Sequence, residues 1–353
     1  MSEPELRIEP LELRTRHVFG LSRSSEQSFH NLVVRMRWQG LEGLGEAAPS
    51  AYYGERAELC RASLPLYWEL ARPRIPGLLE SGDPLPAFEE LHQAWDACLR
   101  RNGGARCALD IALWDLWGKA RGAAAGELWR TAGGAPAGAL NCPPTSYTIA
   151  IDVPETLDAR LAAAAPYSVI KVKLGGPDDR ATLERVRRAT GKPVRVDANC
   201  AWRGAEAVRQ LAPLVSLGLE MIEQPCPPLD VEGLGQVRAA FGVPVYADES
   251  AEDLGDLECV AGRVDGVNVK LVKCGGPTRA LRYIRRAREL GLEVMLGCMI
   301  ETSIGITAAA HLGPLADRLD LDGALLLERD PFCGVVWEQG RPVLPAGPGL
   351  GVR

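Results

Sequence analysis

The sequence contains few of the residues that build sulfur- or nitrogen-ligated metal sites. Only four histidines occur in 353 residues, and none of the ten cysteines belongs to a CxxC pair. A zinc site made of thiolates and imidazoles is therefore poorly supported. Scattered cysteines without pair spacing are typical of reduced thiols that fill small spaces in a core, so we expect a cytoplasmic protein.

Long apolar runs and an excess of positive charge are also lacking. Charged residues interrupt the apolar stretches well before the roughly 20 residues that a membrane-spanning helix requires. Lys and Arg number 40 against 46 Asp and Glu, which gives a net charge of −6. This balance argues against nucleic acid or an anionic membrane as the partner. The first residues, MSEPELRIEPLELRTRHVF, alternate in polarity and resemble a strand more than a signal peptide.

Apolar residues, by contrast, are abundant. They make up 46% of the chain and charged residues 24%, so a large core is available. The length fits two domains, or one barrel with an added domain. The first 50 residues predict a β-meander, and residues 55–72 and 86–121 predict helices. The Gly-, Ala- and Pro-rich segment 122–143 indicates a boundary.

After that boundary, short apolar segments alternate with longer amphipathic ones. From Lys171 to Asp197 the interval is 26 residues, and from Asp197 to Glu223 it is again 26. The next intervals, to Asp248 and then to Lys270, are 25 and 22 residues. One unit of strand, loop, helix and loop needs about that length. Eight such units predict a (β/α)8 barrel. The strand candidates are TSYTIAI, SVIKVKL, VRVDAN, LEMIEQP, VPVYADES, DGVNVKL, LEVMLGCM and LDLDGALLL.

Three carboxylates end three consecutive strand candidates, namely Asp197, Glu223 and Asp248. Active sites of such barrels lie at the carboxyl ends of the strands. Neighbouring strands are about 4.8 Å apart, so we expect the three side chains to converge and to need a cation. All-oxygen ligation favours Mg²⁺, with Mn²⁺ as the alternative.

Lysines supply the second part of the pattern. Lys171 and Lys173 alternate along IKVKLGG, so both ammonium groups face inward, and each like charge lowers the pKa of the other. A base that works near neutral pH needs such a shift. Lys270 lies four strands further round, on the opposite wall. Lys273, at an odd spacing from Lys270, is expected to point away and to be structural or supporting.

Two bases on opposite sides of one carbon, next to a metal, predict a reaction class. One lysine removes the proton α to a carboxylate or carbonyl, and the metal stabilises the resulting enediolate. The other lysine returns a proton on the opposite face, so that the configuration is inverted.

The motifs KVK, VDAN, EQP, ADES and NVKLVKCGG resemble the muconate-lactonizing-enzyme subgroup of the enolase superfamily, in which Lys or His bases work with Mg²⁺. The resemblance covers almost the whole chain. It implies an N-terminal α+β capping domain (residues 1–125), a modified (β/α)8 TIM barrel (140–335) and a tail (336–353) that returns to the cap. It also carries over the family's site residues: metal ligands Asp197, Glu223 and Asp248, catalytic lysines Lys173 and Lys270, and Lys171 as tuning partner.

The stretch RLDLDGALLLERDPF narrows the substrate. Alternation sends the carboxylates of Asp320 and Asp322 to one face, which alone fits a solvated strand end equally well. Dipeptide epimerases of the superfamily carry an Asp-x-Asp on the eighth strand that holds the free α-ammonium of the dipeptide, and DLD resembles it. A substrate without an amine leaves both carboxylates uncompensated. This argues against lactonizing enzymes, o-succinylbenzoate synthases and N-acylamino-acid racemases.

Specificity is expected to come from the loop around FGLSRSSEQSFHN and from barrel residues Ile300 and Ser303. Relatives that act on dipeptides ending in glutamate carry an arginine in that loop. Arg23 is therefore a candidate partner for a substrate carboxylate, and a solvated loop charge is the alternative. Glu301 either bonds a catalytic lysine or is structural.

We therefore expect a Mg²⁺-dependent epimerase that inverts the α-carbon of the C-terminal residue of an L,L-dipeptide. The enzymatic alternative is an N-acylamino-acid racemase or o-succinylbenzoate synthase, and the non-enzymatic one is a barrel that only binds a small molecule or metal. The expected partners are a small-molecule dipeptide and further copies of the chain in a homo-oligomer.

Overall fold

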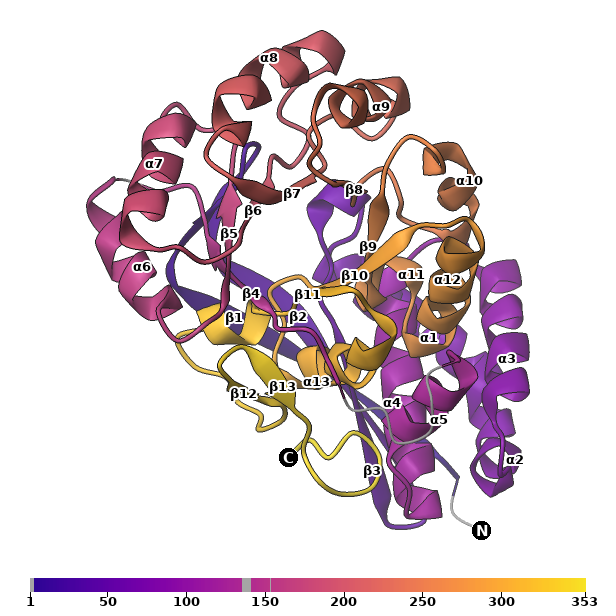
Figure 1. Ribbon diagram of the computed structural model, residues 1–353. Helices are drawn as coiled ribbons and strands as arrows, with labels where there is room; N and C mark the ends of the chain where they lie inside the picture. Colours follow the sequence, from indigo (N-terminus) through magenta and orange to yellow (C-terminus); the bar gives the residue numbers. More distant parts are fainter. Residues whose placement is uncertain (1–2, 135–140, 153) are drawn as a thin grey trace.

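A computed structural model describes residues 3–134, 141–152 and 154–353. It contains a three-stranded antiparallel sheet, an eight-stranded parallel sheet and a two-stranded hairpin. In Figure 1 the helices α7 to α10 and α12 lie around the ring of parallel strands, and α1 to α4 lie to one side of it. The predicted class, a modified (β/α)8 barrel with an N-terminal α+β domain, is confirmed.

The antiparallel sheet has the order β1 (Glu5–Gly20), β2 (Ser25–Trp38) and β3 (Leu41–Ala47). Gln39 and Gly40 join β2 to β3 with φ of 49° and 79°, as a two-residue hairpin turn requires. The helices of this part are η1 (Ala51–Tyr53), α1 (Ala57–Ala71), η2 (Arg72–Arg74), α2 (Ile75–Glu80), α3 (Leu85–Cys98), α4 (Gly103–Arg121) and α5 (Ala125–Ala132).

The single helix predicted over 86–121 is wrong, because the chain forms α3 and α4 there. Helix α3 ends at Cys98, and Arg101 and Asn102, with left-handed φ of 66° and 54°, turn the chain into α4. Helix α4 is buried along most of its length and packs on β3. A Cβ on Gly45 would lie 1.9 Å from the carbonyl oxygen of Ala108, so only glycine permits this contact.

Each of the eight predicted segments contains a barrel strand, and the strands pair in parallel in chain order. A bridge between Thr145 and Leu319 brings the first and last strands together, so the ring is nearly closed. The strands are β4 (Ser146–Ile149), β5 (Val169–Lys173), β6 (Val194–Asp197), β7 (Leu219–Glu223), β8 (Val245–Ala247), β9 (Gly266–Lys270), β10 (Glu293–Gly297) and β11 (Arg318–Asp320).

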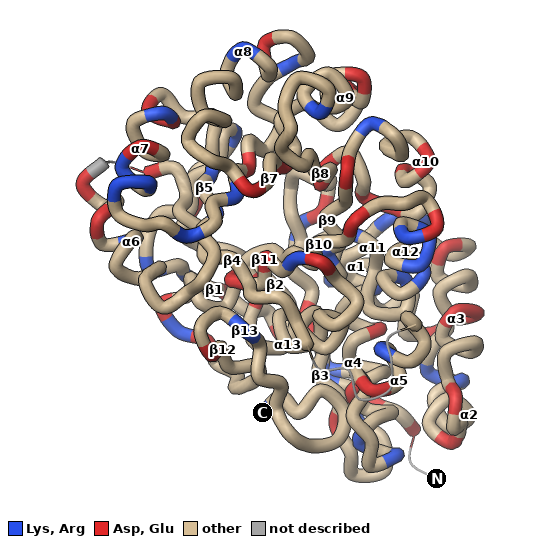
Figure 2. Tube along the Cα trace, in the orientation of Figure 1, with Lys and Arg blue, Asp and Glu red and all other residues tan. Residues whose placement is uncertain are grey.

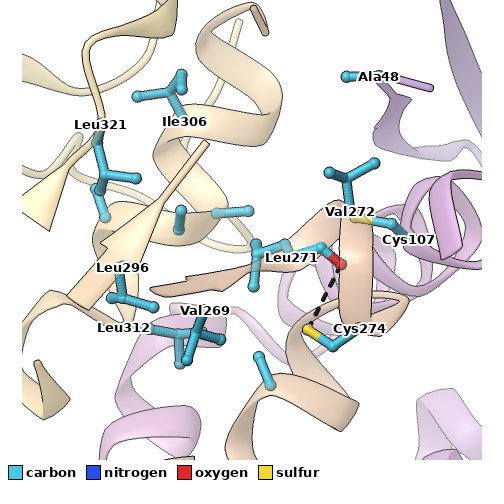
Figure 3. Packing of buried hydrophobic residues seen from close by; sticks show 14 of the residues in the cluster. Ala48, Cys107, Val269, Leu271, Val272, Cys274, Leu296, Ile306, Leu312 and Leu321 are labelled. Atoms are coloured by element: carbon cyan, nitrogen blue, oxygen red, sulfur yellow. Dashed lines mark hydrogen bonds between the residues drawn. The ribbon is translucent and has the colours of Figure 1, made fainter. Parts of the chain in front are cut away.

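Helices and short 3₁₀ turns connect these strands. They are η3 (Pro154–Thr156), α6 (Leu157–Ala164), α7 (Asp179–Ala189), α8 (Gly204–Val215), α9 (Val231–Ala240), η4 (Leu254–Asp256), α10 (Leu257–Val260), α11 (Leu271–Cys274), α12 (Pro277–Glu289), α13 (Ser303–His311), η5 (Gly313–Leu315) and η6 (Gly323–Leu326). Strand side chains such as Val269 and Leu296 pack against Leu312 in the core (Figure 3). No helix in the described part of the chain is long and apolar enough to cross a membrane.

The eighth segment is shorter as a strand than its sequence predicts. Strand β11 ends at Asp320, and residues Gly323–Leu326 form η6, with Asp322 at the N-cap position of η6. Strand alternation therefore does not apply to Asp322. The turn of the chain, rather than alternation, determines where its carboxylate lies.

The last residues of the chain lie against the N-terminal part. The hairpin of β12 (Val336–Glu338) and β13 (Arg341–Val343) follows the barrel. The Leu350 backbone N–H then donates to Asp115 Oδ1 on α4 at 2.9 Å. Asp115 Oδ2 accepts from the Leu44 N–H of β3 at 2.9 Å and from Lys119 Nζ at 2.7 Å. One buried carboxylate thus joins the cap sheet, α4 and the tail.

His311, at the end of α13, is a second contact with the tail. Its Nε2 lies 3.1 Å from the Leu350 carbonyl oxygen, which can only accept, so Nε2 carries the proton. Nδ1 is buried, has no hydrogen-bond partner among the described residues and faces Gly126 of α5. Burial, with the charge of Arg130, lowers the pKa of His311 to about 4, despite the bond to Leu350.

This histidine predicts acid sensitivity of folding. The unfolded chain binds a proton near pH 6.5 and the folded chain only near pH 4, so stability falls as the pH drops from 6.5 to 4. We expect the wild type to lose about 3 kcal/mol more free energy of unfolding than His311→Gln between pH 7 and 4. Urea denaturation of both proteins at each pH measures this, and identical pH dependence would show that His311 is not responsible.

Candidate active site

Charged residues gather at the carboxyl ends of the barrel strands. The final residues of β5, β6, β7, β9 and β11 are Lys173, Asp197, Glu223, Lys270 and Asp320, respectively. Asp248 follows β8 by one residue, and Lys171 lies within β5. Figure 2 shows basic positions beside β5 and acidic positions beside β7 and β8, around the ring of parallel strands.

Lys171 is the cation that holds three of these acids together. Its Nζ lies 3.0 Å from Asp197 Oδ2 and 2.8 Å from Glu223 Oε2. It also lies 2.5 Å from Asp320 Oδ2. Burial by itself lowers the pKa of an ammonium, but the three carboxylates outweigh it and raise the pKa of Lys171 well above its usual value. The sequence predicts that the neighbouring ammonium of Lys173 lowers the pKa of Lys171. The three nearby carboxylates raise this pKa instead, so the prediction is wrong for Lys171.

Lys173 and Lys270 line one cavity of about 450 Å³, together with Asp320 and Asp322. Lys173 Nζ lies 2.7 Å from Asp197 Oδ2, and Lys270 Nζ lies 2.8 Å from Asp248 Oδ2. Although burial opposes it, the charge of Asp248 raises the pKa of Lys270. The two lysines stand on β5 and β9, four strands apart in the sheet.

Asp197, Glu223 and Asp248 are fully buried. Burial raises the pKa of Glu223 to about 7, and the charge of Asp197 adds to the effect. The pKa of Asp197 is lowered instead, because Lys171 and Lys173 outweigh its burial. Asn268 Nδ2 donates to Glu223 Oε1 at 2.7 Å, whereas Glu223 Oε2 is buried and receives no well-aligned hydrogen bond from a described residue.

This donor set is chemically suited to a hard divalent cation, because it offers carboxylate oxygens and no sulfur or imidazole. Among the described residues, Glu223 Oε2 is a buried carboxylate oxygen that meets only the Lys171 ammonium, at 2.8 Å and without hydrogen-bond alignment. As the side chains stand, no three His, Cys, Asp or Glu residues among those described are spaced to share one ion, and lysine ammonium groups bridge the carboxylates. The role of the three acids as ligands stays a prediction.

Asp320 and Asp322 differ in their partners. Besides Lys171, Asp320 accepts a 2.5 Å hydrogen bond from Ser146 Oγ, and Lys171 keeps its pKa low despite burial. Asp322 Oδ2 accepts from the Thr148 N–H at 2.6 Å and forms no ion pair with a described residue. Burial, reinforced by the charge of Asp320, raises the pKa of Asp322 to about 6. Of these two carboxylates, Asp322 is the one without an ion pair to a described residue.

Arg23 is not a solvated loop charge. Its side chain is 27% exposed and lines the cavity. Nη1 lies 2.8 Å from Glu249 Oε1 and donates to the Asn199 carbonyl oxygen at 3.0 Å. The guanidinium stacks 3.8 Å above the Tyr52 ring. Nε and Nη2 form no hydrogen bond with a described residue, so one edge of the guanidinium stays available.

Of the two barrel residues expected to set specificity, only Ile300 lines the cavity. Its carbonyl oxygen accepts from Asn31 Nδ2 of β2 at 2.9 Å, which ties this wall to the cap. Ser303 instead contacts Asp330, and its part in specificity stays a prediction. The N–H and Oγ of Ser303, the first residue of α13, both donate to Asp330 Oδ2, at 2.8 and 2.7 Å.

Glu301 forms no hydrogen bond with a lysine among the described residues. Its Oε1 accepts from the Met299 N–H at 2.8 Å. Burial, together with the charge of Glu46, raises the pKa of Glu301 to about 8. This arrangement favours the structural alternative for Glu301.

Lys273 does not point away from the site. Its Nζ lies 2.6 Å from Asp248 Oδ1. Alternation stops applying after Lys270, because residues 271–274 form the one-turn helix α11. The pair Gly275–Gly276 directly after this turn was the available signal, since Gly275 ends it with a φ of 95°.

The role of Lys171 predicts a large loss of stability on its removal. In Lys171→Met, three buried carboxylates lose their shared cation, so we expect the free energy of unfolding to fall by about 3–5 kcal/mol in metal-free buffer. Adding Asp320→Asn to this variant is expected to restore part of the loss. Urea denaturation measures both, with Lys192→Met as control, because the Lys192 ammonium donates to the backbone carbonyls of Ala164 and Ala165. Equal stability of the Lys171 and Lys192 variants would contradict the assignment.

Comparison with known proteins identifies the family. Residues 7–129 match the family model "Mandelate racemase / muconate lactonizing enzyme, N-terminal domain", and residues 155–353 match "Enolase C-terminal domain-like". An L-Ala-D/L-Glu epimerase of Bacteroides thetaiotaomicron is 35% identical, over 97% of this chain and 86% of the relative. A hydrophobic dipeptide epimerase of Enterococcus faecalis is 31% identical, over 100% of this chain and 99% of the relative.

Solved structures agree with this relationship. The dipeptide epimerase from Enterococcus faecalis, complexed with Mg and L-Leu-L-Tyr, superposes with a TM-score of 0.87 at 29% identity and covers 99% of both chains. The substrate-liganded L-Ala-D/L-Glu epimerase from Bacillus subtilis gives 0.86 at 28% identity, over 100% of this chain and 99% of that one. The chain therefore belongs to the mandelate racemase/muconate lactonizing enzyme family of the enolase superfamily.

Proposed function

We propose that this protein is a Mg²⁺-dependent dipeptide epimerase, an isomerase that inverts the α-carbon of the C-terminal residue of an L,L-dipeptide. One observation carries the proposal: a single cavity is lined by Lys173 and Lys270 from strands four apart and by Asp320 and Asp322. Relatives named L-Ala-D/L-Glu epimerase and hydrophobic dipeptide epimerase support it.

The two lysines handle the proton. With the α-carbon between them, the one that is a neutral amine takes the α-proton, and the other, as an ammonium, donates a proton to the opposite face. In the reverse reaction the roles exchange. Asp197, Glu223 and Asp248 would hold Mg²⁺, which when bound supplies positive charge against the negative charge that develops on the substrate carboxylate.

Asp322 recognises the free amino terminus. Because Lys171 already compensates Asp320, a substrate ammonium adds the cation that Asp322 lacks. An N-acylated amino acid carries no charge on that nitrogen and leaves the buried Asp322 uncompensated. This difference disfavours the N-acylamino-acid racemase and o-succinylbenzoate synthase alternatives.

Arg23 and Ile300 are proposed to contact the substrate side chain. Arg23 offers the edge formed by its Nε and Nη2, which its bonds to Glu249 and Asn199 leave unused. Ile300 offers an apolar wall. We also propose a cytoplasmic location, since all ten cysteines are free thiols, and a homo-oligomeric assembly, on family resemblance alone.

Hydrogen exchange tests the reaction. Incubation with a dipeptide library in D₂O is expected to place deuterium at the α-carbon of the C-terminal residue, as detected by mass spectrometry, and EDTA is expected to abolish the exchange. Absence of exchange with every dipeptide at saturating Mg²⁺ would rule the function out.

The role of Asp322 has its own test. Asp322→Asn is expected to lower kcat/KM for free dipeptides by about 100-fold, since an ammonium–carboxylate contact of about 3 kcal/mol is lost. The same change is expected to leave the slow turnover of N-acetylated dipeptides within about threefold of wild type. Equal losses on both substrate types would contradict recognition of the amine.

Arg23 is tested by substrate preference. Arg23→Met is expected to lower kcat/KM about tenfold or more for dipeptides ending in Glu, relative to those ending in Leu, because only the former pair with a guanidinium. Parallel steady-state measurements with L-Ala-L-Glu and L-Ala-L-Leu give the ratio. A ratio unchanged from wild type would remove Arg23 from the substrate contacts.

A further inference from the structure

Lys273 is a buried lysine that has no role in the reaction proposed above. Its side chain is 2% exposed and does not line the substrate cavity. Nζ lies 2.6 Å from Asp248 Oδ1 and 2.8 Å from the Asp248 carbonyl oxygen. It also lies 2.9 Å from the Asn268 carbonyl oxygen and 3.3 Å from that of Ala251. Three N–H groups thus meet four acceptors, and the ammonium is fully used by the protein.

Asp248 stands between two lysines that take different oxygens. Lys270 Nζ binds Oδ2 at 2.8 Å from the cavity side, and Lys273 Nζ binds Oδ1 at 2.6 Å from behind. A carboxylate held at both oxygens cannot turn about its last single bond without breaking one contact. The direction of Oδ2, and with it the place of Lys270 Nζ, is therefore fixed by the contact at Oδ1.

The local fold makes this contact rigid. Lys270 ends β9, and α11 turns the chain so that Lys273 reaches back beneath the end of β8. The Cys274 thiol donates to the Lys270 carbonyl oxygen at 3.2 Å and also contacts that of Leu271 (Figure 3). A Cβ on Gly103 would lie 2.3 Å from the Val272 carbonyl oxygen, so the start of α4 packs directly on this turn.

We propose that Lys273 is a positioning residue for the Lys270 side of the reaction: it locks the orientation of Asp248 and thereby holds Lys270 Nζ at the substrate α-carbon. The inference rests on the proposed function. Lys173 has a different carboxylate partner, Asp197, which Lys273 does not touch. Loss of Lys273 therefore affects the two bases unequally, whereas a general loss of stability affects both.

Half-reactions separate the two bases. The rate of deuterium uptake from D₂O is measured at saturating Mg²⁺ in two separate reactions, one that starts with the L,L epimer and one that starts with the L,D epimer. The variants Lys173→Ala and Lys270→Ala show which lysine each reaction direction depends on. Lys273→Met is expected to slow the uptake that depends on Lys270 by about 10–100-fold, as loss of a supporting contact to a metal-site carboxylate typically does. The uptake that depends on Lys173 is expected to change less than about threefold. Equal slowing of both directions overturns the proposal.

Structure determination gives a readout without substrate or metal. A crystal structure of metal-free Lys273→Met is expected to show Asp248 rotated and Lys270 Nζ displaced, and an unchanged Asp248 overturns the proposal.

Lys273→Gln, which keeps two N–H donors, serves both measurements if the Met variant does not fold. Lys119→Met is the control, because Lys119 also pairs with a buried aspartate but lies far from the barrel mouth, on α4. Absence of exchange in the wild type contradicts the proposed function, whereas the Asp248 orientation tests Lys273 by itself.

Discussion

The architecture of the barrel mouth depends on charge compensation between buried carboxylates and lysines. Parallel strands end side by side, so a chain with an acid at the end of several strands brings those acids together out of water. An unpaired buried carboxylate is strongly unfavourable, and four acids here lie within reach of an ammonium. The lysine contacts are Lys171 to Asp197, Glu223 and Asp320, Lys173 to Asp197, and Lys270 and Lys273 to Asp248.

Most of the fold follows from local patterns in the sequence. Repeated βα units of similar length predict the barrel, and each of the eight predicted segments contains a strand. Alternation fails where a strand ends sooner than its apolar run, as at Asp322, and where a turn begins at once, as at Lys273. The helix predicted over 86–121 was wrong because Arg101 and Asn102 adopt left-handed φ between α3 and α4, where the stretch RNGG already carries a turn signal.

The candidate site was predictable in its composition but not in its pairing. Sequence position brings Lys173, Lys270, Asp320 and Asp322 to one cavity, as expected. Which carboxylate meets which ammonium depends on side-chain reach across strands that are distant in the chain, and no spacing rule encodes it. The ion pair of Arg23 with Glu249, 226 positions away, could not be predicted for the same reason. The hydrogen bond from Ser303 to Asp330 also follows no spacing rule.

The contact between Leu350 and Asp115 has a consequence for the time course of folding. The two residues are 235 positions apart, so the segment that supplies Leu350 is synthesised well after α4. At typical rates of about 5–20 residues per second, a ribosome needs roughly 10–50 s to make the intervening chain. During that interval the sheet of β1 to β3 and α4 lack the hydrogen bond that the Leu350 N–H later donates to Asp115. The hydrogen bond between Leu350 and α4 can therefore form only after all eight barrel strands have been synthesised.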